Sequence, residues 1–191
     1  MIRRTVVRVA ERLSGWRIVG TMPRQGIFVG APHTSNWDYV LTLMTAWKSG
    51  FSPRILVKRE LFVGPLAWVL RATGSLPVDR SNPRGLVEEL VAESEKAAAH
   101  DKPFVLVLAA EGTRSKTEFW KSGFYRLSQG SGLPVVLGFV DGQNKVAGIG
   151  PTLTPSGDVA ADMDRIRAFY ADKHGIKPEL RTEPRLREEL L

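Results

Sequence analysis

The sequence predicts a single α/β domain, with a mostly parallel central sheet flanked by helices and an N-terminal amphipathic basic helix. Short apolar runs alternate with segments of helical periodicity from residue 26 to residue 174, which is typical of such a sheet. The chain has 191 residues, 43% of them apolar, which is enough for one hydrophobic core and short for two. We therefore expect an amphipathic N-terminal segment over residues 1–25, one main domain over 26–177 and a charged, loosely ordered C-terminal tail over 178–191.

The composition restricts the chemistry. The absence of Cys excludes disulfides, thiolate zinc sites and cysteine nucleophiles, so a reaction must use His, carboxylates or hydroxyls. The formal charge is +7, and residues 1–24 hold six Arg against one Glu. Such a patch suits nucleic acid, an anionic membrane or an acidic carrier protein, and charge alone does not separate these. No apolar stretch approaches the roughly 20 residues of a spanning helix and no signal peptide is recognisable, so we expect a cytoplasmic protein that is not integral to the membrane.

Residues 2–13 have the pattern of a basic amphipathic helix, with apolar positions at helical spacing and arginines on the remaining arc. Two interpretations are open. The helix packs on the core with a solvated charged face, or it lies at a membrane surface with its apolar side in the lipid boundary and its arginines at anionic headgroups. The apolar positions are Ile2, Val6, Val9 and Leu13, and the charged positions are Arg3, Arg4, Arg8, Glu11 and Arg12.

Apolar runs and turn residues divide the rest of the chain into strands and helices. The stretch 59–70 is apolar nearly all round, so it is either deeply buried or in contact with lipid or an acyl chain, and we favour the second. Predicted strands cover 26–31, 55–58, 104–110 and 133–140, with 146–149 pairing nearby. Predicted helices cover 37–47, a stretch beginning after Gly64, 84–99, 124–128 and 159–174.

The first candidate for catalysis lies where the run 26–31 ends. Pro32 stops the strand and three residues that can cap a helix follow, so His33 is predicted to lie on a strand-to-helix turn. If the turn doubles back, the carboxylate of Asp38 can reach one imidazole nitrogen and leave the other facing a substrate, as a general base requires. The alternative is a turn histidine beside a charge at a helix N-terminus. The capping candidates are Thr34, Ser35 and Asn36.

Polar residues also follow two other extended segments. Asp79 and Arg80 end one of them, and the turn from Glu111 to Arg114 follows the run 104–110. In a parallel sheet the carboxyl ends of the strands share one edge, so these residues are expected to converge with His33. The Gly-Thr turn beside an arginine suits a phosphate, although a capping turn with paired Glu and Arg explains the spacing equally well. The Gly-x-Ser-x-Gly elbow, the phosphate loop, the dinucleotide fingerprint and His-Glu-x-x-His are absent, which disfavours the enzymes that carry them.

Four blocks, in order, resemble the lysophosphatidic acid acyltransferase family, also called the PlsC-like glycerolipid acyltransferases. His-Thr-Ser-Asn-Trp-Asp at 33–38 is similar to the family's His-x4-Asp signature. The segments 58–62 and 74–80 resemble its second block, Glu-Gly-Thr-Arg-Ser at 111–115 the third, and Leu-Pro-Val-Val at 133–136 the fourth.

The chain departs from the family pattern at two places. Ala110 stands where a proline usually precedes the third block, and Trp-Lys-Ser-Gly at 120–123 stands for a basic Phe-Lys-Lys-Gly element. The first departure should alter only backbone stiffness. The second bears on which acceptor is used.

The resemblance implies an O-acyltransferase in which His33 deprotonates an acceptor hydroxyl and Asp38 holds the histidine tautomer. The acceptor would be a lysophospholipid such as 1-acylglycerol-3-phosphate, and the donor acyl-CoA or acyl carrier protein, with no cofactor and no metal. The enzyme would bind peripherally to the inner face of an anionic membrane and not to nucleic acid. One alternative is an acyltransferase or transacylase that acts on another lipid acceptor, either a glycolipid or a lysophospholipid other than lysophosphatidate. The other is a non-catalytic basic module that binds a membrane surface or nucleic acid. The residues implied to bind the acceptor are Lys58, Arg80, Glu111, Gly112, Thr113 and Arg114.

Overall fold

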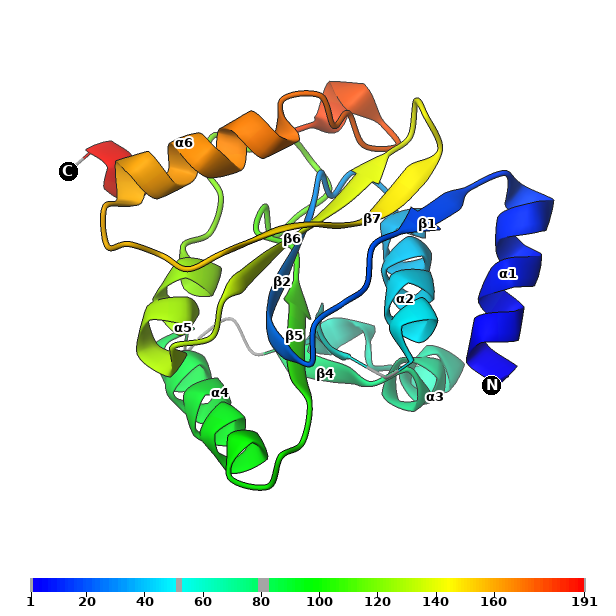
Figure 1. The fold of residues 1–191 in the computed structure, drawn as a ribbon, viewed down its shortest axis with the longest axis horizontal. Helices are drawn as coiled ribbons and strands as arrows, with labels where there is room; N and C mark the ends of the chain where they lie inside the picture. Colours follow the sequence, from blue (N-terminus) through cyan, green and yellow to red (C-terminus); the bar gives the residue numbers. More distant parts are fainter. Residues whose placement is uncertain (1, 51–52, 79–82, 191) are drawn as a thin grey trace.

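The computed structural model describes residues 2–50, 53–78 and 83–190 and contains one seven-stranded sheet with helices on both faces (Figure 1). The strands are β1 (Arg17–Val19), β2 (Gln25–Ala31), β3 (Arg54–Lys58), β4 (Ser75–Val78), β5 (Phe104–Leu108), β6 (Val135–Asp141) and β7 (Val146–Leu153). The α-helices are α1 (Ile2–Ser14), α2 (Trp37–Ser49), α3 (Gly64–Ala72), α4 (Pro83–Ala98), α5 (Gly123–Ser131) and α6 (Val159–Tyr170). Short 3-10 helices are η1 (Arg59–Leu61), η2 (Pro178–Leu180) and η3 (Arg187–Leu190).

The sheet is parallel apart from one pair of strands. Its order is β1-β7-β6-β2-β5-β3-β4, and only β6 and β7 run antiparallel. The carboxyl ends of β2, β5, β3 and β4 therefore lie along one edge, next to that of β6. This arrangement confirms the predicted α/β class with a mostly parallel sheet.

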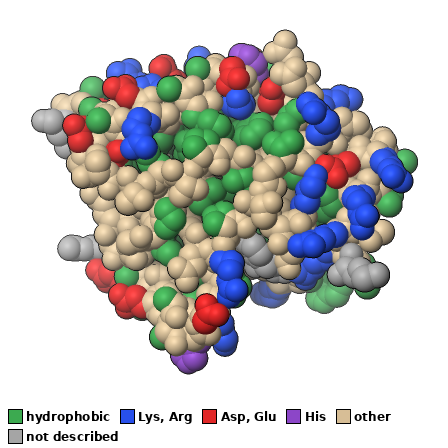
Figure 2. Space-filling view, in the orientation of Figure 1, with side chains coloured by type: hydrophobic (Ala, Val, Ile, Leu, Met, Phe, Trp, Pro, Cys, Tyr) green, Lys and Arg blue, Asp and Glu red, His purple; other side chains and the backbone are tan. Residues whose placement is uncertain are grey.

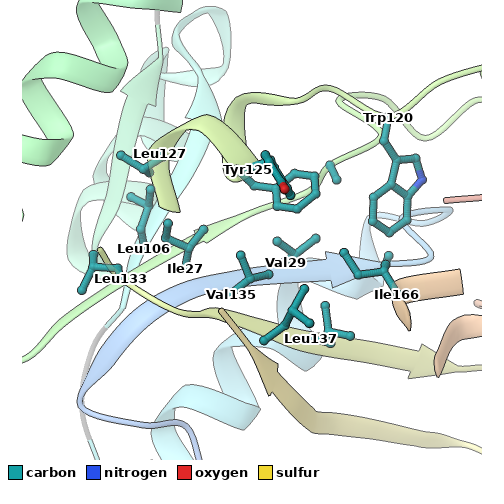
Figure 3. Packing of buried hydrophobic residues seen from close by; sticks show 14 of the residues in the cluster. Ile27, Val29, Leu106, Trp120, Tyr125, Leu127, Leu133, Val135, Leu137 and Ile166 are labelled. Carbon is teal, nitrogen blue, oxygen red and sulfur yellow. The ribbon is translucent and has the colours of Figure 1, made fainter. Parts of the chain in front are cut away.

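The central strands are buried on both faces, which explains why their sequences are continuous apolar runs. Alternate residues of β2 point to opposite sides, so Ile27 and Val29 join one core cluster and Phe28 joins another. In β6, Val135 and Leu137 lie in the first of these clusters, close to Leu106, Ile166 and the α5 residues that Figure 3 labels. The sheet thus separates two hydrophobic layers.

The two layers contain different helices. The cluster around Ile27 packs against α4, α5 and α6, whereas the other clusters pack against α1 and α2. In Figure 1, α4, α5 and α6 lie to one side of the sheet, and α1, α2 and α3 lie to the other. β1 falls within residues 1–25 and extends the sheet at its edge, beside β7.

Exposed apolar side chains are concentrated on the side of α1, α2 and α3. The apolar stripe expected on α1 points outward, with Ile2 81% and Leu13 83% exposed, while Val7 anchors the helix in the core. No helix among the described residues is both long and apolar enough to cross a membrane. The large exposed apolar residues on this side are Ile2, Val6, Val9, Leu13, Trp37, Val40, Leu61, Val63, Leu66, Trp68 and Val69.

The C-terminal segment is folded against the domain, and the expectation of a loosely ordered tail is wrong for residues 178–190. Thr182, Pro184 and Leu186 are buried and alternate with exposed charged residues, as in an extended segment with one face on the core. The Thr117 N–H donates to the Thr182 hydroxyl at 3.0 Å, which ties the segment to the chain that follows β5. The expectation of a loosely ordered tail was based on the high charge density of this segment. In the fold the charged side chains point to solvent, and the residues that alternate with them, at 182, 184 and 186, are buried.

Candidate active site

His33 lies on the turn between β2 and α2, as the sequence predicts. β2 ends at Ala31, the Ala31–Pro32 peptide is cis, and α2 begins at Trp37. The His33 side chain is 25% exposed, and its Nδ1 lies 3.2 Å from Oδ2 of Asp38. Nε2 is therefore the ring nitrogen that remains for a substrate.

Asp38 holds both the histidine and the turn. Its Oδ2 accepts the backbone N–H groups of Thr34 and Ser35, each at 2.8 Å, and the same oxygen faces Nδ1 of His33. The carboxylate is buried, and its Oδ1 has no hydrogen-bond partner among the described residues. These contacts fix the loop in one shape and place the Asp38 carboxyl group beside the imidazole.

The three residues expected to cap α2 make different contacts. Ser35 accepts the Trp37 N–H at 3.2 Å, whereas the Asn36 side chain makes no capping bond. The Thr34 hydroxyl turns away from the helix and accepts the backbone N–H groups of Ile176 and Lys177, each at 3.1 Å. The segment after α6 therefore supports the turn across 142 residues of sequence, a contact that no local pattern could have predicted.

Glu111 lies behind His33 and points into the protein. Its Oε1 accepts the His33 backbone N–H at 2.8 Å, and its Oε2 is buried without a hydrogen-bond partner in the described part of the chain. Burial raises the pKa of Glu111 to about 7, although the His33 N–H opposes the shift. This carboxyl group therefore positions the His33 backbone, and it is not aimed at the edge where a phosphate could bind.

The turn that follows Glu111 remains open to solvent on its other side. Gly112 has φ +69°, a conformation that favours glycine, and Thr113 is half-buried with its hydroxyl accepting the Ser115 N–H. Arg114 is exposed and has no acidic partner among the described residues. The alternative interpretation, in which Glu111 and Arg114 form an ion pair, is therefore wrong. Lys121 adds a second cation, because its side chain runs alongside Gly112.

The remaining predicted residues lie further along the sheet edge. Lys58 is the exposed last residue of β3, two strand spacings or about 10 Å from the end of β2. Asp79 and Arg80 lie outside the described residues. The structure therefore brings His33, Asp38 and Glu111 into contact and places Gly112, Thr113 and Arg114 beside them. Lys121 was not among the residues expected to bind the acceptor, although it lies in the Trp-Lys-Ser-Gly element at 120–123 that stands for the family's basic element.

A family model described as Acyltransferase matches residues 16–138. The chain belongs to the acyltransferase family. The fold of this acyltransferase is similar to the crystal structure of the 1-acyl-sn-glycerophosphate (LPA) acyltransferase PlsC from Thermotoga maritima, with a TM-score of 0.59 and 17% sequence identity. That likeness covers 92% of this chain and 77% of the other chain. No curated protein matches the sequence.

The family model confirms the acyltransferase part of the resemblance that the four sequence blocks indicate, and the structural comparison shows that the fold is similar to that of PlsC. The matched region contains all of β2 to β5 and so includes the His33 turn and the Glu111 turn. An acyl donor and a lipid acceptor are the substrates that this family implies.

Proposed function

We propose that this acyltransferase transfers a fatty acyl group from acyl-CoA or acyl carrier protein to the hydroxyl of a lysophospholipid of the 1-acylglycerol-3-phosphate type. The observation that carries the proposal is the 3.2 Å contact between Nδ1 of His33 and Oδ2 of Asp38, at the strand edge beside the Gly112 turn. An ionised carboxylate at Nδ1 favours the tautomer with its proton there, which leaves the Nε2 lone pair to act as a base.

The residues suit a direct transfer with no enzyme-bound intermediate. Nε2 of His33 takes the proton of the acceptor hydroxyl while the oxygen attacks the thioester carbonyl. The carbon–sulfur bond then breaks, the acyl ester forms, and the imidazolium returns its proton to the leaving thiolate. The negative charge of Asp38 stabilises the imidazolium in between, and a positioned base of this kind is typically worth about 10²–10⁴-fold in rate.

The Gly112 turn supports a phosphate-bearing acceptor. Arg114 and Lys121 supply two positive charges, and neither has an acidic partner among the described residues. Lys58 lies on the same edge, two strands away. Cations without partners at a strand edge favour a dianionic phosphate ester over a neutral glycolipid.

The exposed apolar residues support peripheral contact with a membrane. They lie on α1, α2 and the η1–α3 region, whereas on the opposite side of the sheet α4, α5 and α6 contribute none to the large exposed apolar residues and η3 contributes only Leu190, among the described residues. Lys and Arg side chains gather on the side of the molecule where α1 lies (Figure 2). Apolar side chains flanked by cations fit the interface of an anionic bilayer, here the inner face of the cell membrane.

The test is an acyl-transfer assay of the full chain with acyl-CoA or acyl carrier protein and a panel of lysophospholipids and glycolipids. We expect the highest kcat/KM with lysophosphatidate. His33→Ala should abolish transfer while the circular dichroism spectrum is unchanged, whereas His100→Ala, at the exposed end of α4, should retain it. Turnover by a folded His33→Ala protein would overturn the mechanism.

The phosphate site has its own test. Arg114→Ala should raise KM for lysophosphatidate with little change in kcat, because in the proposed complex this side chain binds the phosphate of the acceptor, away from the reacting atoms. Exposed Lys116 is the control, and Lys116→Ala should leave KM unchanged. An unchanged KM in Arg114→Ala would argue against a phosphate at the Gly112 turn.

A further inference from the structure

The first turn of α2 carries Asp38, and the backbone hydrogen bonds that start this helix are long. The Asp38 nitrogen lies 3.4 Å from the Ser35 carbonyl oxygen, and the Tyr39 nitrogen lies 3.3 Å from the Asn36 carbonyl oxygen. Both distances exceed the usual range of about 2.7–3.2 Å. The Asn36 side chain makes no capping bond either. The start of α2 therefore depends on contacts from outside the helix to hold it in place.

Tyr39 makes such a contact. Its neighbours Trp37 and Val40 are exposed, whereas the Tyr39 ring packs against a core cluster between α2 and the sheet. Its hydroxyl oxygen lies 2.6 Å from Oγ1 of Thr73, at the end of α3, and 2.8 Å from Oγ of Ser75, the first residue of β4. The Tyr39 side chain thus joins the start of α2 to the junction of α3 and β4.

The three hydroxyl groups form a hydrogen-bonded chain with one direction. The Thr73 hydroxyl donates its proton within its own helix, where the carbonyl oxygens of Val69 and Leu70 both lie at 2.9 Å. Thr73 therefore accepts from Tyr39, which uses the one proton of the Tyr39 hydroxyl, and Ser75 must donate to Tyr39. Ser75 is buried, so loss of the Tyr39 oxygen removes the acceptor of a buried donor, which is costly. The chain is therefore satisfied only when all three side chains are present.

The contact between His33 and Asp38 thus depends on attachments to different parts of the fold. The His33 backbone is attached to the turn after β5, because its N–H donates to Glu111. The helix end that carries Asp38 is attached to α3 and β4 through the next residue, Tyr39. The distance of 3.2 Å between Nδ1 of His33 and Oδ2 of Asp38 is kept only while both attachments hold.

We propose that Tyr39 is a positioning residue, whose hydroxyl group holds the first turn of α2 so that the Asp38 carboxyl group stays against Nδ1 of His33. The role of this pair in acyl transfer rests on the proposed function. Tyr39 acts through Asp38 and not on the substrate, since its hydroxyl group is already engaged by Thr73 and Ser75. Loss of the hydroxyl group should therefore slow the reaction without weakening the binding of the acceptor.

Tyr39→Phe tests the proposal, because it keeps the ring and removes only the hydroxyl group. In the acyl-transfer assay of the full chain we expect kcat to fall by about 3- to 30-fold, since a small misplacement of reacting groups by a remote mutation costs up to about 10²-fold. KM for lysophosphatidate should change little. Thr73→Val/Ser75→Ala removes both partners and should lower kcat to a similar extent. The triple variant should be hardly slower, because the three hydroxyl groups act as one unit.

The matched control removes a tyrosine hydroxyl group from the other side of the sheet. The Tyr125 hydroxyl donates to Oδ2 of Asp162 at 2.9 Å, within the cluster that packs against α4, α5 and α6. Tyr125→Phe should lower the melting temperature but leave kcat unchanged. Wild-type kcat in Tyr39→Phe, an equal loss of kcat in Tyr125→Phe, or a change confined to KM would overturn the proposal.

Proton NMR of the full chain keeps this test separate from the proposed function, because it needs no turnover. A proton on Nδ1 of His33, facing Oδ2 of Asp38, should give a downfield signal that is missing in His33→Ala. We expect exchange with water to weaken this signal in Tyr39→Phe, where the contact is loosened, but not in Tyr125→Phe. An unchanged signal in Tyr39→Phe would overturn the positioning role. A weakened signal in a chain without turnover would support that role and contradict the proposed function alone.

Discussion

Among single residues, Asp38 combines a structural and a chemical role in one oxygen atom. Oδ2 accepts two backbone N–H groups of the turn and faces Nδ1 of His33. The two N–H groups hold this oxygen in place, so the carboxyl group stays beside the imidazole. The shape of the loop and the position of the carboxyl group beside His33 are therefore linked.

Substituting Asp38 with Asn separates these two roles. The Asn oxygen can still accept the N–H groups of Thr34 and Ser35, so the turn is kept, but the neutral amide cannot stabilise an imidazolium. We expect kcat to fall by about 10²–10⁴-fold with a melting temperature close to that of the wild type. A variant with wild-type kcat would show that the charge of Asp38 is not needed.

Glu111 predicts a pH dependence of stability. Burial raises its pKa in the folded protein to about 7 from 4.5, so between these values the folded state binds a proton that the unfolded state has released. Its stabilising contribution is complete below about pH 4.5 and is lost as the pH rises to 7, with a slope of at most about 1.4 kcal/mol per pH unit.

Glu111→Gln removes this titration while keeping a carbonyl oxygen that can accept the His33 N–H. Unfolding by denaturant at several pH values should show the wild type losing up to about 3 kcal/mol relative to the variant between pH 4.5 and 7. Taking the difference between the two proteins cancels the other titrating groups. If the free energies of unfolding of the wild type and Glu111→Gln changed with pH in parallel, burial would not raise the pKa of Glu111.

Among the elements, the segment after α6 supports the His33 turn most directly. Gly175 has φ +71°, and a Cβ on it would lie 2.9 Å from the Thr34 hydroxyl oxygen. Its N–H donates to the Val140 carbonyl, which attaches the segment to the end of β6. Thr34 is thus held between its own turn and the C-terminal part of the chain.

Gly175→Ala should therefore reduce both stability and activity. The left-handed backbone alone costs about 1–2 kcal/mol for a residue with a Cβ, and the contact with Thr34 shifts the turn that holds His33. Gly157→Ala is the matched control, because Gly157 has φ +98° and nothing within 4 Å of its added Cβ. We expect a loss of melting temperature in both variants, larger in Gly175→Ala, and a loss of kcat only in Gly175→Ala. Equal kcat values would show that the contact does not matter for catalysis.

At the scale of the whole molecule, the sheet separates two sides with different surfaces. The side formed by α4, α5 and α6 buries its apolar residues, whereas the side formed by α1, α2 and α3 exposes many (Figure 1). Trp68 on α3 is 73% exposed and Trp37 at the start of α2 is 67% exposed. Because Trp37 follows the His33 turn by four residues, docking through this side would bring the active site close to the lipid surface.

Tryptophan fluorescence can test this orientation. In a variant whose only tryptophan is Trp68, vesicles of brominated phosphatidylcholine should quench the emission strongly. A variant whose only tryptophan is Trp120, which is buried on the other side of the sheet, should be quenched little. Comparable quenching of both would contradict docking through the α1–α3 side.

The sequence by itself determined the parallel sheet, its main strands and the His33–Asp38 pair. These depend on local patterns, since a doubly buried strand needs a continuous apolar run and the spacing of His33 and Asp38 fits one strand-to-helix turn. The Glu111–Arg114 turn forms although Ala110 stands where the family usually has a proline.

Only the tertiary structure decided which surfaces these elements bury. α1 packs through Val7 and leaves its longer apolar stripe outside, which periodicity alone cannot reveal because it identifies a face without its partner. Glu111 turns its carboxyl group inward to the His33 N–H, although the same motif could equally have faced solvent. The support of Thr34 by the segment after α6 depends on residues 142 positions apart, which only the folded chain brings together.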